Sequence, residues 1–261
     1  AHYLKYGVLD EKAVLFESFH GTTLSDSPFY MMKELHESGK NMKIYFTTQH
    51  YETHKKMIDD YGFDVELVKL NSFRYAKVLA TSKYLVNNVS FPPYFMRHKN
   101  QKYLNTWHGT PLKTLGKKMV QGIEDMSNMQ RNFLHCTDLL YPNDFTMAHM
   151  MEDYNLFGLF TGKTIVSGYP RNSIFMDVEK AKRTRMNFHL AYMPTWRGTQ
   201  SNVAVNELYA KDVNAILERL DQELNDNQIL FVNLHSLVKD DVPVDGYKHI
   251  FPFPNIDNYE F

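Results

Sequence analysis

Short apolar runs alternate with amphipathic stretches along most of the chain. The apolar runs predict buried strands, and the stretches with apolar positions three or four residues apart predict helices. Strands are predicted at residues 13–16, 42–47, 84–86, 103–107 and 164–166, and helices at 27–38 and 51–61. Because a crossover helix must separate two parallel strands, this order predicts a Rossmann-like α/β domain over residues 1–175.

The alternation restarts after a basic stretch at residues 179–185, which we predict to be helical. Strands are then predicted at residues 188–193, 229–234 and 249–251, with a helix at 206–224. These elements predict a second Rossmann-like domain over residues 176–261. Residues 255–261 begin a helical pattern whose apolar face is incomplete, so we expect this domain to be truncated.

The region between residues 117 and 158 is rich in methionine and predicts helices. Methionine at helical spacing usually fills a core, although a surface that faces a membrane or an acceptor is the alternative. The methionines concerned are Met119, Met126, Met129, Met147, Met150 and Met151.

Composition narrows the class of protein. The 261 residues are 43% hydrophobic, which predicts a globular protein. The 29 basic and 30 acidic side chains nearly cancel, so the chain has no net positive electrostatic field that would attract nucleic acid. The single Cys136 excludes an intrachain disulfide framework and a thiolate metal cluster, and it suits a reducing cytoplasm. No apolar run approaches the roughly 20 residues that cross a bilayer, and the first five residues do not form a signal peptide.

The segment from Tyr103 to Gly116 carries the most prominent candidate chemistry. Its apolar start predicts a buried strand, and Thr110 with Pro111 predicts the start of a helix, so His108 would stand at a strand's carboxyl end. Ligands bind at this edge of open α/β sheets, and helix N-termini favour anions. Trp107 would line the site and exclude water, Gly109 would let a ligand approach the backbone, and Lys113 would help to bind a phosphate group. A hydrogen-bonded structural histidine is the alternative for His108.

Three further segments place polar residues after predicted strands. Arg171, within 167–172, could bind phosphate in a two-pronged manner, or it could form an ion pair between the domains. Thr195 and Arg197 follow the strand at 188–193, where Trp196 could line a cleft and Arg197 could neutralise a phosphate or remain solvated. His235, followed by Ser236, ends the strand at 229–234, where a core or surface imidazole is the alternative. The loop at residues 17–28 could cradle an anionic acceptor, although most such loops only connect elements.

Two apparent motifs do not fit their patterns. His50 and His54 have the spacing of a zincin helix, but Glu52 stands one position too late, and an exposed helix face is predicted instead. Residues 158–164 resemble a P-loop, but they have one residue too few between the glycines and precede a strand. The sequence therefore predicts neither zincin chemistry nor ATP binding.

Residues 107–113, Trp-His-Gly-Thr-Pro-Leu-Lys, resemble the CDP-glycerol glycerophosphotransferase family of teichoic acid primases and polymerases. Segments 16–19, 25–28, 167–172 and 194–198 match that family in the same order, so the resemblance spans nearly the whole chain. It implies a GT-B-like fold of two Rossmann-type domains with an interdomain cleft. The acceptor would approach the N-terminal domain and the nucleotide would rest on the C-terminal one. His108 matches the family histidine proposed as catalytic and His235 the second, although Ser236 stands where many members have proline.

The resemblance implies transfer of glycerol phosphate, or ribitol phosphate, from a CDP-activated donor to a lipid-linked polyol-phosphate acceptor, with release of CMP. His108 would be the general base, and His235 with Arg197 would stabilise the diphosphate, assisted by Lys113 and Arg171. No cofactor is required, although a divalent cation such as Mg²⁺ could help. The enzyme would act peripherally at the cytoplasmic face of the plasma membrane, and a homo-oligomer is compatible with the sequence. The alternatives are a GT-B nucleotide-sugar glycosyltransferase and a non-catalytic module that binds an anionic polymer.

Overall fold

The structure, a computed structural model, describes residue 3 and residues 7–119, 123–176, 188–194, 203–234 and 242–254. The chain divides into two compact units, Ala1–Asp177 and Val178–Phe261. The predicted helix at 179–185 and the pattern at 255–261 lie outside the described residues. Each unit is an α/β structure, as the alternation of apolar and amphipathic segments predicted.

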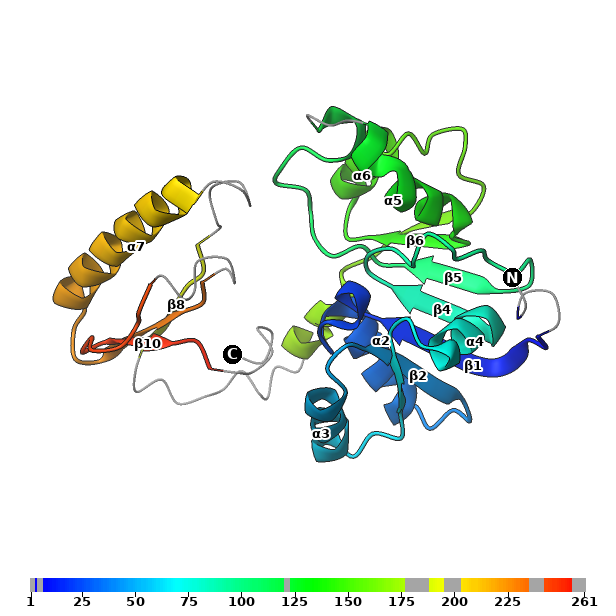
Figure 1. Ribbon diagram of the computed structural model, residues 1–261, viewed down its shortest axis with the longest axis horizontal. Helices are drawn as coiled ribbons and strands as arrows, with labels where there is room; N and C mark the ends of the chain where they lie inside the picture. The colour runs from blue at the N-terminus through cyan, green and yellow to red at the C-terminus, as the bar shows by residue number, and fades with distance from the viewer. Residues whose placement is uncertain are drawn as a thin grey trace. The chain divides into compact units, whose positions relative to one another are not determined.

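The first unit is built on a seven-stranded sheet whose neighbouring strands are all parallel (Figure 1). The strand order is β3-β2-β1-β4-β5-β6-β7, so the direction of winding reverses between β1 and β4. In open sheets of this kind ligands bind beyond the carboxyl ends of the strands, at the point of reversal. The strands are β1 (Asp10–Glu17), β2 (Lys43–Thr48), β3 (Glu66–Lys69), β4 (Ser82–Asn87), β5 (Lys102–Asn105), β6 (Asp138–Tyr141) and β7 (Lys163–Val166).

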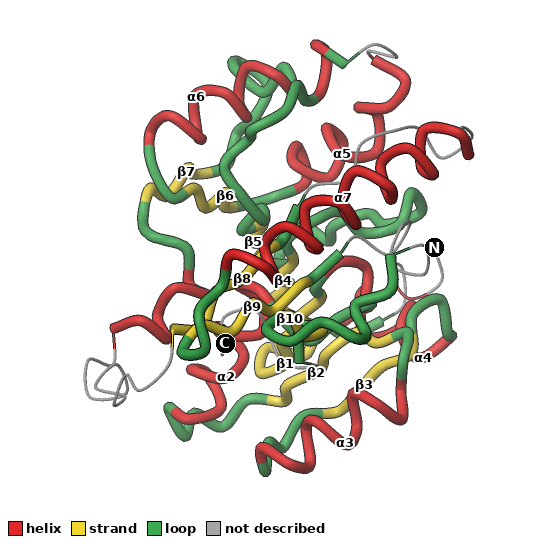
Figure 2. The backbone as a smooth tube through the Cα atoms, turned by 90° about the vertical axis from the view of Figure 1, so that its left-hand side faces the viewer, coloured by secondary structure: helices red, strands yellow, loops and turns green. Residues whose placement is uncertain are grey.

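Helices connect these strands and flank the sheet (Figure 2). The α-helices are α2 (Asp26–Glu37), α3 (Tyr51–Tyr61), α4 (Phe73–Thr81), α5 (Ile123–His135) and α6 (Asp144–Asp153). The short 3-10 helices are η1 (Phe19–Gly21), η2 (Gly116–Lys118) and η3 (Pro170–Met176).

The core explains why the strands appear in the sequence as continuous apolar runs. Residues 13–17 of β1 are all buried, because helices cover both faces of a parallel sheet. On one face Leu15 packs with Tyr75 of α4 and Phe133 of α5 in the main core cluster. On the other face Phe16 stacks on Phe46 of β2.

The predicted strands and helices of the first unit correspond to observed elements, with three differences. β3 and α4 were not predicted, and the region 117–158 holds β6 between α5 and α6. β5 ends at Asn105, because Trp107 adopts a left-handed backbone with φ of +51°. Met126, Met150 and Met151 are buried, which confirms the interpretation of these three as core residues.

The prediction that His50 and His54 lie on an exposed helix face is wrong for His54. His54 is buried, and its Nδ1 lies 2.6 Å from the Thr48 hydroxyl. α3 begins directly after β2, so the helix face that carries His54 and Ile58 turns toward the sheet.

The second unit has a three-stranded parallel sheet in the order β10-β9-β8. Its core joins Val213 and Leu217 of the helix to Leu230 and Val232 of the central strand. The elements are β8 (Phe188–Tyr192), α7 (Val203–Glu223), β9 (Gln228–Val232) and β10 (Ile250–Pro252). They match the predicted strand–helix–strand–strand order.

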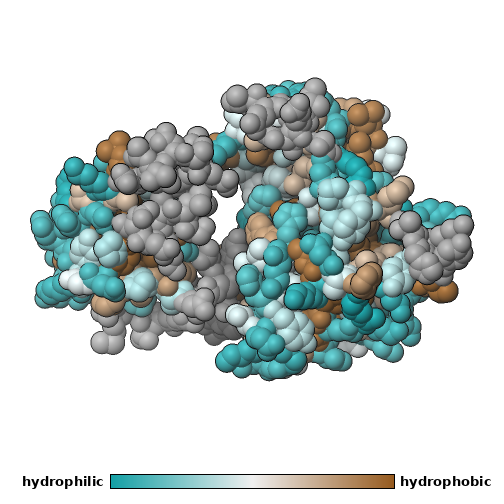
Figure 3. All heavy atoms as spheres, viewed as in Figure 1, coloured by the Kyte–Doolittle hydropathy of each residue, from teal (hydrophilic) through white to brown (hydrophobic). Residues whose placement is uncertain are grey.

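The visible surface of the first unit is mainly hydrophilic on the face drawn in Figure 3, with hydrophobic residues interspersed. None of the described helices is both long and apolar enough to cross a bilayer.

Candidate active site

Buried polar residues gather where the central strands of the first unit end. The last residues of four strands are polar, and each is 1% exposed or less. They are Glu17 of β1, Thr48 of β2, Asn87 of β4 and Asn105 of β5. Buried polar groups are costly unless they are paired, so a layer of them at one edge of a sheet is typical of a functional site. This is the edge at which ligands bind in such sheets.

A network of asparagines holds the segment that follows β5. The Asn105 amide donates to Asn87 Oδ1 at 2.7 Å and to the Val89 carbonyl at 2.6 Å, while Asn105 Oδ1 accepts from the Trp107 backbone N–H at 2.9 Å. Tyr103 reaches Asn87 Oδ1 from the core at 3.0 Å. Because Asn105 forms hydrogen bonds through both its amide nitrogen and its amide oxygen, the turn that carries His108 has a defined shape.

Strained backbone conformations concentrate at the same edge. Among the described residues six non-glycine residues have positive φ, and two of them are asparagines, which tolerate that region. The other four lie in the segments that follow β1 and β5: Phe19 (+44°) and His20 (+56°) in η1, Asp26 (+62°) at the start of α2, and Trp107 (+51°) after β5. Such strain costs about 1–3 kcal/mol per residue and clusters at active sites.

His108 lies half-buried in this edge with a defined orientation. Its Nδ1 is 2.9 Å from the Asn88 carbonyl oxygen, which can only accept a hydrogen bond. Nδ1 therefore carries the proton of the neutral ring and Nε2 keeps its lone pair. Burial lowers the pKa of His108, which keeps the imidazole neutral near pH 7. A neutral ring whose Nδ1 proton is held in this way has Nε2 available to accept a hydrogen bond or a proton.

Trp107 lies behind the histidine. It is buried in the core against Phe133, and its ring centroid is 4.0 Å from that of His108. Trp107 therefore lines the site as predicted. Because it is only 5% exposed, it shields His108 from water more than it could contact a substrate.

The predicted helix at Thr110 and Pro111 is wrong. Residues 109–115 form a loop, and the next helical turn is η2, so no helix N-terminus points from this segment into the site. The Thr110 hydroxyl lies 3.0 Å from that of Thr146 on α6 in place of capping a helix. Lys113 is exposed on the loop, and a Cβ placed on Gly109 would meet no atom within 4 Å, so the space beside His108 is open.

Arg171 is a structural partner of the His108 loop. Its Nη1 donates to the His108 carbonyl at 2.7 Å and lies 3.0 Å from Asp26 Oδ2. The ion pair joins α2 to η3 within the first unit, so the alternative of an ion pair between domains is wrong for this contact. Arg171 thereby ties the segment after β7 to the segment after β5 and to the start of α2.

The remaining predicted site residues, Thr195, Arg197, His235 and Ser236, lie outside the described residues. Their roles stay predictions. Sequence reasoning singled out the loop at residues 17–28, which holds Glu17 and Asp26, but it missed Asn88 and Asn105, which also build the site. The available signal was a polar residue at the end of a buried apolar strand.

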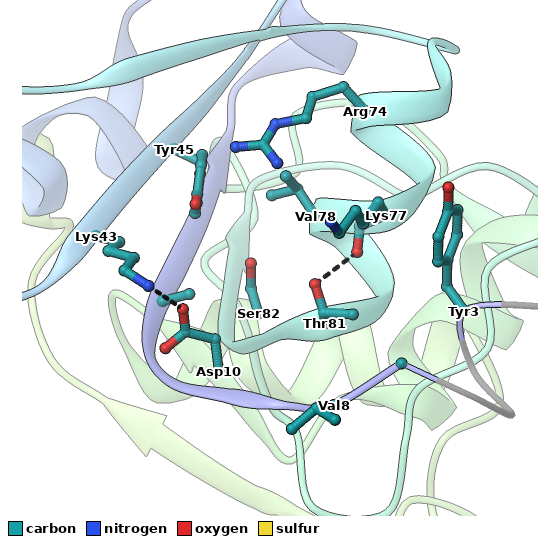
Figure 4. A pocket seen from close by; sticks show the side chains of 12 residues that line it. Tyr3, Val8, Asp10, Lys43, Tyr45, Arg74, Lys77, Val78, Thr81 and Ser82 are labelled. Carbon is teal, nitrogen blue, oxygen red and sulfur yellow. Dashed lines mark hydrogen bonds and ion pairs between the residues drawn. The ribbon is translucent and has the colours of Figure 1, made fainter.

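A separate cavity of about 420 Å³ opens at the opposite edge of the sheet (Figure 4). It is lined by the amino-terminal ends of β1, β2 and β4 and by α4. Lys43 is paired with Asp10 at 2.7 Å, and Arg74 forms two hydrogen bonds with Glu66. Two of its three cationic side chains, Lys43 and Arg74, are thus already neutralised, and ligands of this fold bind at the other edge.

In the described part of the chain, no group of three or more His, Cys, Asp or Glu side chains is placed to hold a metal ion.

Comparison with known proteins identifies the family. Residues 2–251 match the model of the CDP-Glycerol:Poly(glycerophosphate) glycerophosphotransferase family. The chain is 27% identical over 257 residues to a teichoic acid poly(glycerol phosphate) polymerase of Staphylococcus epidermidis, covering 91% of this chain and 34% of that protein. It is 28% identical over 262 residues to a polymerase of the same name from Bacillus spizizenii, covering 92% and 63%. The chain therefore spans between about one third and just under two thirds of these relatives.

Solved structures agree on the fold. A structure of the wall teichoic acid polymerase TagF superimposes with a TM-score of 0.73 at 23% identity, covering 93% of this chain and 61% of that one. A co-structure of S. aureus MnaA with UDP gives 0.59 at 11% identity, covering 95% and 70%. These likenesses support the GT-B-like α/β architecture. With a family model that matches nearly its entire length, the chain belongs to the CDP-glycerol:poly(glycerophosphate) glycerophosphotransferase family.

Proposed function

We propose that this chain takes part in transferring glycerol phosphate from CDP-glycerol to the terminal hydroxyl of a polyol-phosphate acceptor, with release of CMP. The family name and the names of the polymerase relatives support this reaction class. One TagF structure, 21% identical to this chain, was obtained after a soak with CDPG.

The observation that carries the proposal is the orientation of His108. Its Nδ1 proton is held by the Asn88 carbonyl, so Nε2 is the atom that can take a proton from the attacking hydroxyl. The hydroxyl oxygen would form a bond to the donor's β-phosphorus as the bond to the CMP oxygen breaks. Burial lowers the pKa of His108 and thus favours the basic form near neutral pH.

The other assignments follow from the resemblance and from charge. His235 and Arg197 would stabilise the diphosphate as charge develops on it, with Thr195, Ser236 and Lys113 as further contacts. For Arg171 the ion pair with Asp26 favours a supporting role over phosphate binding. Mg²⁺ could assist the diphosphate, and CDP-ribitol could replace CDP-glycerol as donor. We further propose a lipid-linked acceptor and peripheral attachment at the cytoplasmic face of the plasma membrane.

The first test is CMP release from CDP-glycerol with a lipid-linked glycerol-phosphate acceptor. Replacement of His108 by Ala should lower the rate at least about 100-fold, in keeping with the loss of a general base. His98→Ala is the matched control, because His98 precedes β5 at the opposite edge of the sheet, and it should keep the wild-type rate. Release of CDP or UDP in place of CMP would contradict the proposal and identify a sugar transferase, and a His108→Ala rate equal to wild type would remove His108 as the base.

A further inference from the structure

The carboxyl group of Glu17 is buried at the point where the sheet reverses. Glu17 is the last residue of β1 and is 0% exposed. Tyr75 of α4 donates to its Oε2 at 2.8 Å, whereas its Oε1 has no hydrogen-bond partner among the described residues. The Thr47 hydroxyl of β2 also faces the carboxyl, and together with Tyr75 it opposes the effect of burial on the pKa of Glu17. Leaving such an oxygen unsatisfied is costly, so a site that does so usually has a use for it.

His20 lies between this carboxyl and the open side of the sheet edge. Its Nδ1 is 4.0 Å from Glu17 Oε1, and its side chain is 50% exposed. The Gln49 amide donates to the His20 carbonyl at 2.9 Å, which holds the strained turn of η1 in place. One side of the imidazole therefore faces a buried carboxyl while the ring remains accessible from solvent.

The same loop contacts His108. Phe19, next to His20, meets the His108 ring edge-on, with centroids 5.6 Å apart. The Phe19 N–H donates to Asn88 Oδ1 at 2.9 Å, and the Asn88 carbonyl accepts from His108 Nδ1. The loops that carry the two histidines are thus joined through one asparagine at the end of β4.

Resting on the function proposed above, we propose that His20, supported by Glu17, binds a phosphate group of the polyol-phosphate acceptor beside His108. His20 would contact the phosphate, and Glu17 would act as a positioning residue. When the anion binds, the Glu17 Oε1–H bond breaks and an N–H bond forms at His20 Nδ1. The resulting imidazolium lies between the phosphate and the new carboxylate, and no proton is exchanged with solvent.

The electrostatics of the pair favour such a transfer. Burial raises the pKa of Glu17 to about 7 and lowers the pKa of His20, against the opposing effect of a hydrogen bond with the Ser90 backbone, so burial favours the neutral form of both groups in the free protein. The groups that face Glu17 are Tyr75, Tyr94 and His20. None of these is a cation when His20 is neutral, so the carboxyl keeps its proton until an anion arrives.

The test uses sn-glycerol 3-phosphate as the acceptor probe and the full chain with isotope-labelled histidines. Nuclear magnetic resonance should show the His20 ring signals moving on titration, and His20→Ala should weaken binding roughly tenfold or more, the effect of one charge-assisted hydrogen bond. His98→Ala should bind as wild type. Thermal unfolding of each variant checks that the fold is kept.

Calorimetry in two buffers of different ionisation enthalpy separates a positioning role from a merely structural one. The phosphate monoester probe itself titrates at about pH 6 and contributes equally to both proteins, so the difference between them is read: at about pH 6.5 Glu17→Gln should take more protons from solvent on binding than the wild type. Equal proton uptake by the two proteins would overturn the role of Glu17.

A parallel titration with CDP-glycerol distinguishes the acceptor from the donor. If His20→Ala weakens CDP-glycerol binding and leaves glycerol 3-phosphate binding unchanged, the acceptor assignment is overturned. CMP release by the wild type is measured in parallel. If no CMP is released but probe binding depends on His20, the proposed transferase activity is rejected and the phosphate site is retained. Normal CMP release together with unchanged probe binding in His20→Ala would reject the inference alone.

Discussion

Asp26 is 2% exposed and adopts a left-handed backbone conformation, and its carboxylate is paired with Arg171. The Arg171 guanidinium is also bound to the His108 carbonyl, so one buried ion pair supports the loop of the proposed base. Removing one partner of a buried pair leaves an uncompensated charge, which costs more than the pair contributes.

Arg171→Ala should therefore lower the free energy of unfolding by about 3–5 kcal/mol, measured by urea denaturation. The double variant Asp26→Ala/Arg171→Ala should lose less than the sum of the single variants, because no lone charge remains. Arg219→Ala is the control: the Arg219–Glu223 pair is exposed on α7, and its loss should leave the free energy of unfolding close to that of the wild type. A stability loss for Arg171→Ala as small as that for Arg219→Ala would contradict the assigned role.

Glu17 should make stability depend on pH. The folded state raises the pKa of this carboxyl from 4.5 to about 7, so it binds the proton more tightly than the unfolded chain. The resulting stabilisation is complete below pH 4.5 and is lost as the pH rises through about 7, a change of roughly 3 kcal/mol. Glutamine cannot ionise, so the unfolding free energy of Glu17→Gln relative to wild type should rise between pH 5 and pH 9. A constant difference over that range would show that Glu17 is not buried as a neutral acid.

At the scale of elements, the loop after β5 depends on one glycine at its far end. Gly116 opens η2 with φ of +56°, and a Cβ there would lie 2.1 Å from the Asp153 carbonyl oxygen at the end of α6. Lys118 of η2 also pairs with Asp153 at 2.7 Å. The loop that carries His108 is thus anchored on α6 through backbone contact that leaves no room for a side chain.

Gly116→Ala should consequently lose at least about 2 kcal/mol of unfolding free energy, from strain together with steric overlap. Gly39→Ala provides the matched control, since Gly39 also has positive φ (+66°) but a Cβ there would meet nothing within 4 Å. It should show the conformational cost alone, about 1 kcal/mol. Equal losses in thermal or urea unfolding would show that the contact with Asp153 does not constrain the loop.

At the scale of the whole molecule, each unit has its own sheet and its own buried cluster. We predict that residues 1–177 expressed alone unfold cooperatively on heating, with helical and strand signals in circular dichroism. They should also retain glycerol 3-phosphate binding, since Glu17, His20 and His108 all belong to this unit. A fragment without a cooperative transition would show that the first core depends on the second unit.

Much of the architecture followed from local patterns. The apolar runs in β1, β2 and β4 were recognisable because central parallel strands are buried on both faces, whereas β7 is an exposed edge strand. β3 and β6 were missed: a strand of four residues is too short to be separated from a helical segment by periodicity, and β7, of the same length, stood out by its β-branched residues Thr164, Ile165 and Val166. The position of His108 after a strand was also predictable, since motif and strand are adjacent in sequence.

By itself, the sequence determined the α/β class, the two-unit order and the family, because these depend on periodicity and on motifs that are contiguous along the chain. Tertiary structure alone decided that Thr110 caps no helix, that Arg171 pairs with Asp26, and that Glu17 lies beside His20 at the sheet edge. Arg171 and Asp26 are 145 residues apart. Contacts over such separations arise when parallel strands bring their carboxyl ends to one edge, and no local pattern records which side chains meet there.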